Sequence, residues 1–267
     1  MFGSEKILEG NKIINSSFLL IILFIFSLDL NAQGSSGEKA RYESLYIVNM
    51  PTAGIVPKYS FSIYSNIFEN SGLFAEINAS PFSNFNMGLS FGGTNILGNG
   101  EVTWQSLPGV LIRIRIFDES LGFPAILIGF NSQGRGSYSA DLKRFQNLSP
   151  GFFLTASKSY TWKFGSLAFH GGINYSLEPL PSDRVPNYYA GLEQSLGNRG
   201  SVNIEYNATL DEKPGLIMDK RGLLNLALRF AFTQNMTVEL QFIDLFNHSA
   251  GGQRAVRRLG IEYIDSF

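Results

Sequence analysis

The sequence predicts an all-β fold, an antiparallel up-and-down transmembrane β-barrel of about twelve strands with short periplasmic turns and longer external loops. Three observations predict it. The first 32 residues have the pattern of an export signal, and the rest of the chain repeats segments in which apolar and polar residues alternate. The links between those segments are alternately short and long, as in bacterial outer-membrane barrels.

The composition excludes several classes of protein. The chain has 267 residues, including 28 Gly and 23 Phe, and charged residues make up only 16%. This apolar content argues against disorder, and the net charge of −1 argues against a nucleic-acid partner. There are no cysteines and only two histidines, so we expect no disulfide scaffold, metal site or cofactor.

Residues 1–32 are predicted to be a signal peptide. Lys6 and Lys12 precede an apolar run over 13–26, and the small residue Ala32 marks the expected cleavage site. The alternative is a membrane anchor, but the run is shorter than the ~20 residues that a spanning helix needs. No later segment is long and apolar enough for such a helix, so the exported chain is either soluble or a β-barrel.

Period-two alternation identifies the strands. It is clearest at 84–91, where Phe85, Met87 and Leu89 share one face and polar or small residues share the other. Twelve such segments are expected, at 58–68, 72–80, 84–92, 107–117, 123–132, 150–157, 164–176, 187–196, 200–210, 222–231, 236–243 and 255–265. Many have the length of about 9–11 residues that a tilted membrane strand needs.

The lengths of the links favour a barrel over a soluble sandwich. After the first link, every odd-numbered link is long and every even-numbered link is short. Aromatic residues at the ends of the apolar faces could form interfacial girdles, or they could fill the core of a sandwich. These aromatic residues are Tyr59, Phe61, Tyr175, Tyr188, Tyr206, Phe230 and Tyr263. An even number of strands places both ends of the barrel on the periplasmic side.

The end of the chain provides a separate indication. Tyr263 and Phe267 lie on the apolar face of the last strand. This arrangement resembles the C-terminal signal by which the barrel-assembly machinery recognises outer-membrane proteins. Outer-membrane lipid and that machinery are therefore the expected partners.

Residues 33–57 are expected to be a periplasmic N-terminal lead-in to the barrel at 58–267. Pro51, Gly54 and Pro57 cannot sit in a continuous central strand, so this stretch should be rich in turns. It either tucks into the periplasmic mouth of the barrel or forms a simple tether.

Two motifs in this region resemble the N-terminal barrel of the YjbH-like outer-membrane family. The first is Pro51-Thr52-Ala53 with Pro57, and the second is Pro81-Phe82, a turn that leads into a strand. The resemblance covers about residues 46–95, with a weaker match at 123–138. It implies an outer-membrane barrel associated with exopolysaccharide production, and it brings no catalytic residues.

Strand parity places a balanced set of charged side chains in the lumen. They are Glu76, Arg113, Arg115, Glu193, Glu205, Arg229, Glu239, Arg258 and Glu262. One interpretation is a structural network of ion pairs, since unpaired buried charges are costly. The other is a substrate path, in which Arg113 and Arg115 would contact an anionic solute.

Signals for enzymatic chemistry are weak. A hydrolase would need Ser, His and a carboxylate in mutual reach, but His170 has no serine two residues on and His248 is expected in an external loop. The stretch 211–215 is expected to be a solvated loop and not a calcium site.

The expected function is therefore non-enzymatic, with no catalytic residues. The leading hypothesis is an accessory role in envelope transport or exopolysaccharide export, with polysaccharide or a small solute as partner. The alternatives are a structural or adhesive barrel with a closed, salt-bridged lumen and an envelope hydrolase.

Overall fold

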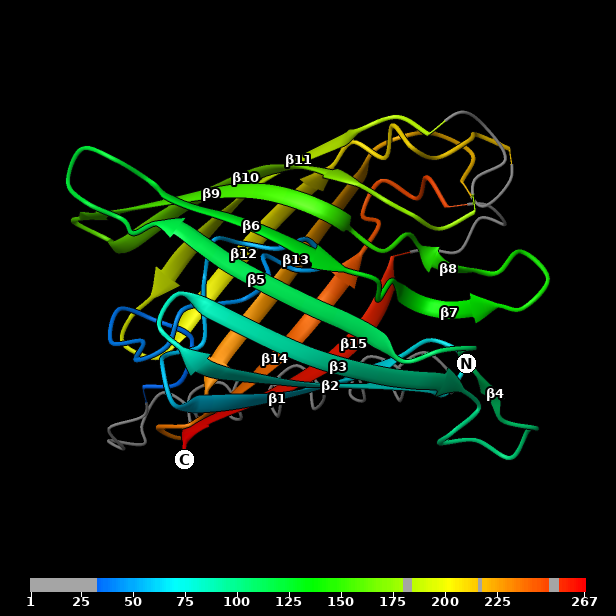
Figure 1. The fold of residues 1–267 in the computed structure, drawn as a ribbon, viewed down its shortest axis with the longest axis horizontal. Coiled ribbons are helices and arrows are strands. Elements are labelled where there is room, and N and C mark those ends of the chain that lie inside the picture. Colours follow the sequence, from blue (N-terminus) through cyan, green and yellow to red (C-terminus); the bar gives the residue numbers. More distant parts are fainter. Residues whose placement is uncertain (1–32, 180–183, 216–217, 250–254) are drawn as a thin grey trace, which may run out of the picture. The chain divides into compact units, whose positions relative to one another are not determined.

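Twelve long antiparallel strands close into a barrel in the computed structural model (Figure 1). The structure describes residues 33–179, 184–215, 218–249 and 255–267, so the expected signal peptide lies outside the described residues. The barrel closes because β1 pairs with β2 on one side and with the last strand, β15, on the other. Every other long strand pairs with its neighbours along the chain, so the up-and-down barrel fold predicted from the sequence is confirmed.

The long strands agree closely with the predicted segments. They are β1 (Ser60–Phe68), β2 (Gly72–Phe82), β3 (Phe85–Thr94), β5 (Gly109–Phe117), β6 (Ala125–Asn131), β9 (Gly151–Trp162), β10 (Gly165–Tyr175), β11 (Asn187–Leu196), β12 (Gly200–Asn207), β13 (Leu223–Ala231), β14 (Met236–Ile243) and β15 (Val256–Ser266). Three short strands, β4 (Thr103–Trp104), β7 (Arg135–Ser139) and β8 (Arg144–Asn147), lie within long links and were not expected.

β9 extends five residues beyond its predicted end at 157. Lys158–Trp162 continues to pair with β10, and Tyr160 contacts Phe169 edge-on. The predicted end was too early because Lys158 stands on the same, outward face as Leu154 and interrupts the row of apolar residues that marks the strand.

The two ends of the barrel differ in the length of their links. At one end, which we call the short-turn end, the strands are joined by residues 83–84, 118–124, 163–164, 197–199 and 232–235. At the other, the long-loop end, they are joined by 69–71, 95–108, 132–150, 176–186, 208–222 and 244–255. β7 and β8 form a hairpin in the longest of these loops. Figure 1 shows this hairpin beyond the ends of the long strands.

The outer wall is apolar and the inner wall is largely polar. In β3, Met87 and Leu89 on the outer face are 52% and 61% exposed. Asn86, which precedes Met87 and faces the lumen, is fully buried. The same alternation runs around the barrel, so most of the large exposed side chains are Ile, Leu, Phe and Tyr. This arrangement reverses that of a soluble protein and is typical of a barrel in lipid. Among the described residues, no helix is long and apolar enough to span a membrane.

Glycines on the inner wall make room for large side chains of the neighbouring strand. Gly129 pairs with Phe153, and a Cβ on Gly129 would lie 2.3 Å from the Cζ atom of that ring. Gly172 pairs with Tyr189, and a Cβ on Gly172 would lie 2.5 Å from the phenol oxygen of that side chain. These aromatic rings cover the glycine backbone from inside the barrel, which stabilises a curved sheet.

The packing at Gly129 predicts a measurable cost of substitution. Gly129→Ala should destabilise the folded barrel by about 2 kcal/mol, because the added methyl group overpacks Phe153 and the backbone of Ile112. Gly171→Ala is the matched control, since its Cβ would meet its nearest neighbour at 3.6 Å, an ordinary contact. Equilibrium unfolding in urea with the protein in lipid vesicles measures both. Equal stability of the two variants would contradict this account of the inner wall.

Candidate functional site: a lumen filled by the N-terminal segment

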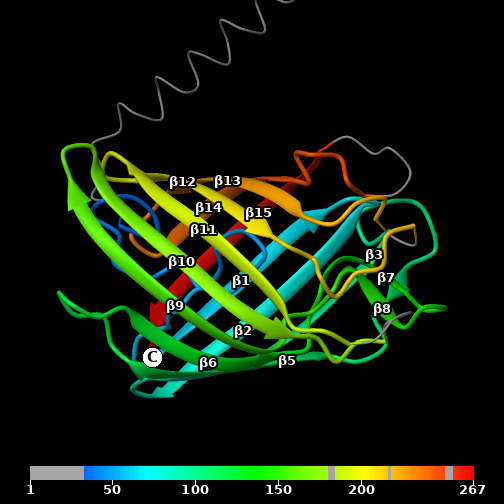
Figure 2. The ribbon, with the colours of Figure 1, turned by 90° about the horizontal axis from the view of Figure 1, so that it is seen from above.

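Residues 33–57 run through the interior of the barrel, and we call this segment the plug. Figure 2 shows it as a blue coil enclosed by the strands. Ile47 and Ala53 are fully buried, and Val48 and Val56 nearly so. The segment therefore lies deeper than a lead-in tucked into the mouth, and it is not a free tether.

The plug folds back on itself at a tight turn over residues 47–50. The Ile47 NH donates to the Met50 carbonyl at 2.8 Å, and Tyr46 forms an isolated bridge with Pro51. Two limbs flank this turn: residues 33–46 lead into it and residues 51–57 lead out of it. Because neither limb pairs with a barrel strand, its backbone groups need partners from the side chains of the wall.

Glu205 of β12 holds the turn. Its Oε2 atom accepts hydrogen bonds from the backbone NH groups of Val48, Asn49 and Met50 at 2.9, 2.9 and 2.8 Å. Its other oxygen accepts from Asn225 at 2.8 Å. Three converging NH groups satisfy a buried carboxylate much as an anion-binding nest does.

Basic side chains of the wall bind the backbone carbonyls of both limbs. Arg229 donates to the carbonyls of Tyr46 and Ile47 at 2.7 and 3.0 Å. On the opposite side of the turn, Arg113 donates to the carbonyls of Thr52 and Gly54 at 2.7 and 2.9 Å.

Two further wall residues extend this set of contacts along the second limb. Arg115 donates to the Ala53 carbonyl at 2.7 Å and pairs with Glu43. The Asn86 side chain accepts from the NH of Val56 and donates to its carbonyl, at 2.8 and 3.2 Å, as a strand partner would.

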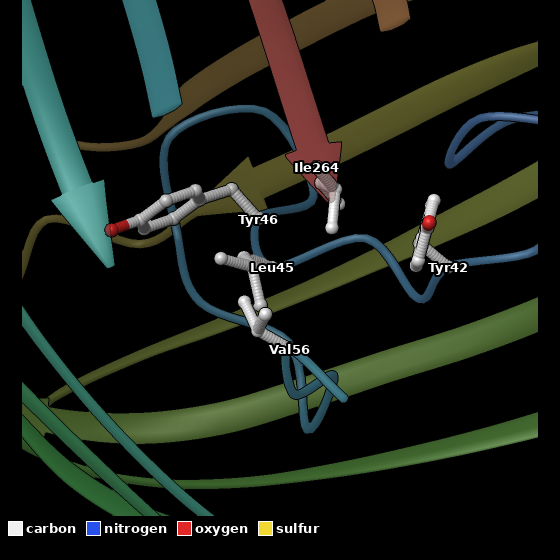
Figure 3. Close-up of a cluster of buried hydrophobic side chains, with 5 residues drawn as sticks. All are labelled: Tyr42, Leu45, Tyr46, Val56 and Ile264. Carbon is white, nitrogen blue, oxygen red and sulfur yellow. The ribbon is translucent and has the colours of Figure 1, made fainter. Parts of the chain in front are cut away.

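Side chains of the plug also contact the wall. The Tyr46 hydroxyl bonds the carboxylate of Glu76 at 2.9 Å. Four plug residues form an apolar cluster with Ile264 of β15 (Figure 3); they are Tyr42, Leu45, Tyr46 and Val56. A second cluster joins Ala53 to Leu127 and Phe153 of the opposite wall. The plug is thus fixed on both sides of the lumen.

All nine charged residues expected in the lumen lie on the inner wall, but many of their partners were not expected. Arg229 pairs with Glu239 and lies 3.8 Å from Glu193, as a network of wall charges would require. Five others instead bind the plug, namely Glu76, Arg113, Arg115, Glu205 and Glu262, the last of which accepts from Ser35. The ninth, Arg258, pairs with Glu69 in the first link.

The remaining sequence motifs lie in three places. Pro51, Thr52, Ala53 and Pro57 belong to the plug, whereas Pro81 and Phe82 end β2 at the short-turn end. Tyr263 points outward from β15. The backbone NH of Phe267 donates to the carbonyl of Tyr59 at 2.9 Å, which joins the last residue of the chain to the entry of the first strand.

The hairpin of β7 and β8 caps the long-loop end. Arg135 of this hairpin is buried, and its guanidinium lies over the rings of Tyr46 and Phe74 at 4.5 and 4.6 Å. Because Tyr46 belongs to the plug, the cap and the plug are in direct contact. The sequence did not indicate that Arg135 is buried, because it lies between two glycines in a stretch typical of a loop turn.

A second buried group ties the hairpin to the loop over 208–222. Arg144 of β8 forms a bidentate ion pair with Glu212, and both side chains are almost fully buried. Glu178 accepts from the NH of Phe145 at 2.7 Å. The prediction of a solvated loop at 211–215 was therefore wrong for Asp211 and Glu212, because the hairpin folds over them.

The two histidines have structural partners. His170 Nδ1 lies 2.8 Å from the Ser157 hydroxyl, which also accepts from the NH of Ala53 in the plug. His248 Nδ1 lies 2.7 Å from the Gly222 carbonyl between two long loops. Among the described residues, no group of three or more His, Asp or Glu could hold a metal ion.

Several solved outer-membrane proteins are similar to this chain in structure. The KdgM porin superimposes with a TM-score of 0.44 and 13% identity over 78% of this chain and 99% of its own. The NanC porin gives 0.42 and 9% over 78% and 99% of the two chains. Omp33 of Acinetobacter baumannii gives 0.42 and 8% over 80% and 100%. No family model and no curated protein matches the sequence, so membership of the YjbH-like family is not shown.

The buried loop cluster predicts a pH dependence. Burial and the neighbouring Glu212 carboxylate raise the pKa of Asp211 to about 7. The folded loop therefore binds more protons than the unfolded loop between about pH 4 and 7, so its stability falls as the pH rises through this window. Asp211→Asn should remove that fall.

Hydrogen exchange of residues 208–215 at pH 5 and pH 8, corrected for intrinsic rates, measures this effect. The loop should lose protection at pH 8 in the wild type and keep it in the Asp211→Asn variant. Asp219→Asn, at an exposed position of the same loop, is the control and should behave as the wild type. Equal protection of the wild type at both pH values would refute the prediction.

Proposed function

We propose that the protein is an outer-membrane β-barrel that its own N-terminal segment keeps closed, and that solutes cross only when this segment leaves the lumen. The short-turn end then faces the periplasm and the long loops face outward. One observation carries the proposal: the wall binds the backbone of the plug through Glu205, Arg229 and Arg113, so the plug occupies the path that an open porin would leave free.

The chemistry of the wall supports a releasable plug. Inward positions next to the plug carry Ser, Asn, Thr, Glu and Arg side chains, which water can solvate when the plug moves out. The wall holds the plug backbone through hydrogen bonds of Glu205, Arg113 and Arg229, and such bonds exchange with water at a net cost of about 1.5–3 kcal/mol each. An apolar wall could not form hydrogen bonds with water in this way after the plug had left.

We propose that the exported substrate is a polysaccharide. The motifs at Pro51 and Pro81 resemble those of a family associated with exopolysaccharide, which supports an accessory role in polysaccharide export. Cleavage of the leader after about Ala32 would leave the plug as the start of the mature chain. The outward Tyr263 and the terminal Phe267 would serve the assembly machinery as its signal.

A permanently closed structural barrel is the second candidate. The observation that favours it is the cap, because the buried pair of Arg144 and Glu212 and the stacked Arg135 close the long-loop end as well. Breaking a buried ion pair costs several kcal/mol. In this case the external loops would carry the function.

Single-channel conductance in a planar bilayer distinguishes the two. The wild type should be closed almost all the time. Glu205→Ala should raise the open probability about a hundredfold, because three buried NH groups of the turn lose their acceptor at a combined cost of about 3 kcal/mol. Silence of this variant, once its insertion is demonstrated, would favour the structural barrel. Steady conductance of the wild type would contradict both candidates.

A disulfide between the plug and the wall provides the matched control. The Cγ2 atom of Ile47 lies 2.7 Å from the position of a Cβ on Gly191, close enough for a bridge between Ile47→Cys and Gly191→Cys once the carbonyl of Ile204, 2.6 Å from that Cβ, shifts slightly. The chain has no other cysteine. In the Glu205→Ala background, the oxidised pair should abolish the openings and reduction should restore them. If the openings persist when the disulfide is oxidised, they do not arise from movement of the plug.

A further inference from the structure

The plug leaves part of the lumen empty at the short-turn end. A cavity of about 240 Å³ lies between the plug and the wall formed by β5, β6, β9, β10 and β11. Its inner end is closed where Ala53 of the plug meets Ser157 and His170.

The cavity exists because the wall is built there from small side chains. Ser157, Ser159, Ser166, Ala168 and Ser195 occupy adjacent inward positions on β9, β10 and β11. Elsewhere in the lumen, Arg, Glu, Gln and Tyr side chains fill the space between the wall and the plug. On this side the plug contributes small residues, among them Gly37, Ala40 and Gly54, so neither side of the cavity fills it.

The carboxylates that line the cavity already have cationic partners. Glu43 pairs with Arg115, and Glu119 lies 3.2 Å from Lys158. Glu193 lies 3.8 Å from Arg229. No lone buried carboxylate is thus left to select a cationic solute. Of the two guanidinium groups that line the cavity, that of Arg115 is engaged by Glu43 and the plug backbone. That of Arg41 lies over the ring of Tyr42 on a side chain exposed to solvent.

Hydroxyl groups provide most of the remaining hydrogen-bonding capacity. Each hydroxyl offers one donor and two acceptor sites. Ser195 accepts from the NH of Ser166 at 2.7 Å and keeps its own proton free for a ligand. Among the described residues, the buried Nε2 atom of His170 has no hydrogen-bond partner. The aromatic ring of Tyr42 also lines the cavity.

We infer that this cavity is a binding site for a neutral, hydroxyl-rich solute of about the size of one sugar ring. The hydroxyl groups of such a solute both donate and accept hydrogen bonds, as the serine hydroxyls of the cavity do. Its apolar ring face can pack on an aromatic side chain. A cationic solute would lose hydration without gaining an unpaired carboxylate. An anionic solute would meet only Arg41, and an ion pair at such an exposed position contributes little.

The site also bears on gating, a consequence that rests on the proposed function. Plug residues, including Ser44, Thr52 and Ala53, form one side of the cavity. The complete site therefore exists only while the plug is in place. A ligand that binds the closed state alone stabilises that state by mass action, so occupancy from the periplasmic side holds the barrel shut.

Binding of three matched sugars to the full-length protein in detergent tests the inference. Glucose, glucuronate and glucosamine share one ring and differ in charge. Calorimetry or ligand-observed NMR should show glucose binding at least tenfold more tightly than either charged sugar. Ala168→Leu fills the cavity and should weaken glucose binding at least tenfold. Ala190→Leu makes the same change on the outer face and should leave binding unaltered.

Three outcomes would overturn the inference: no binding of glucose at 100 mM, equal binding of the three sugars, or full binding by Ala168→Leu. A conductance measurement then distinguishes glucose binding from its effect on the movement of the plug. In Glu205→Ala, glucose on the periplasmic side should lower the open probability about tenfold. Binding without this effect would retain the site and refute its coupling to the plug, whereas a wild type that conducts steadily would refute the plug itself.

Discussion

The structure depends on one constraint: charges inside the barrel must have partners, and the plug supplies them for Glu205, Arg113 and Arg115. Glu205 shows this most clearly, since its carboxylate is fully buried and receives three successive NH groups of the turn at 47–50. Without the plug, Glu205 and Arg113 would face an open lumen and need water. With it, they position the backbone of a segment that has no regular secondary structure of its own.

The closed state joins the two ends of the barrel. Tyr46 of the plug contacts Glu76 on the wall and Arg135 in the hairpin that caps the long-loop end. A shift of the plug therefore removes one of the aromatic faces on which Arg135 rests, and a shift of the hairpin exposes Tyr46. Because a packed interior changes between discrete arrangements, the cap and the plug are expected to move together.

The sequence was sufficient for the fold because the barrel signal is local. Alternation such as that of Met87 and Leu89, together with link lengths, identified all twelve strands and the inward face of charges such as Arg113 and Glu205. It was not sufficient for the site, because the contacts of the plug join residues far apart in the sequence, from 30 positions for Tyr46 and Glu76 to 157 positions for Val48 and Glu205. No periodic pattern marks such contacts. Arg135 and Glu212 were missed for the same reason, since only the folded hairpin buries them.

The most direct test of the central claim is the accessibility of the turn at the tip of the plug. Asn49→Cys places the only thiol of the chain in that turn, where the native side chain is 7% exposed. A bulky, water-soluble maleimide should fail to label it in the folded barrel and should label it fully after unfolding. Lys39→Cys, at an exposed position of the same segment, should react at once. Rapid labelling at position 49 in the folded protein would show that the lumen is open and would contradict this account.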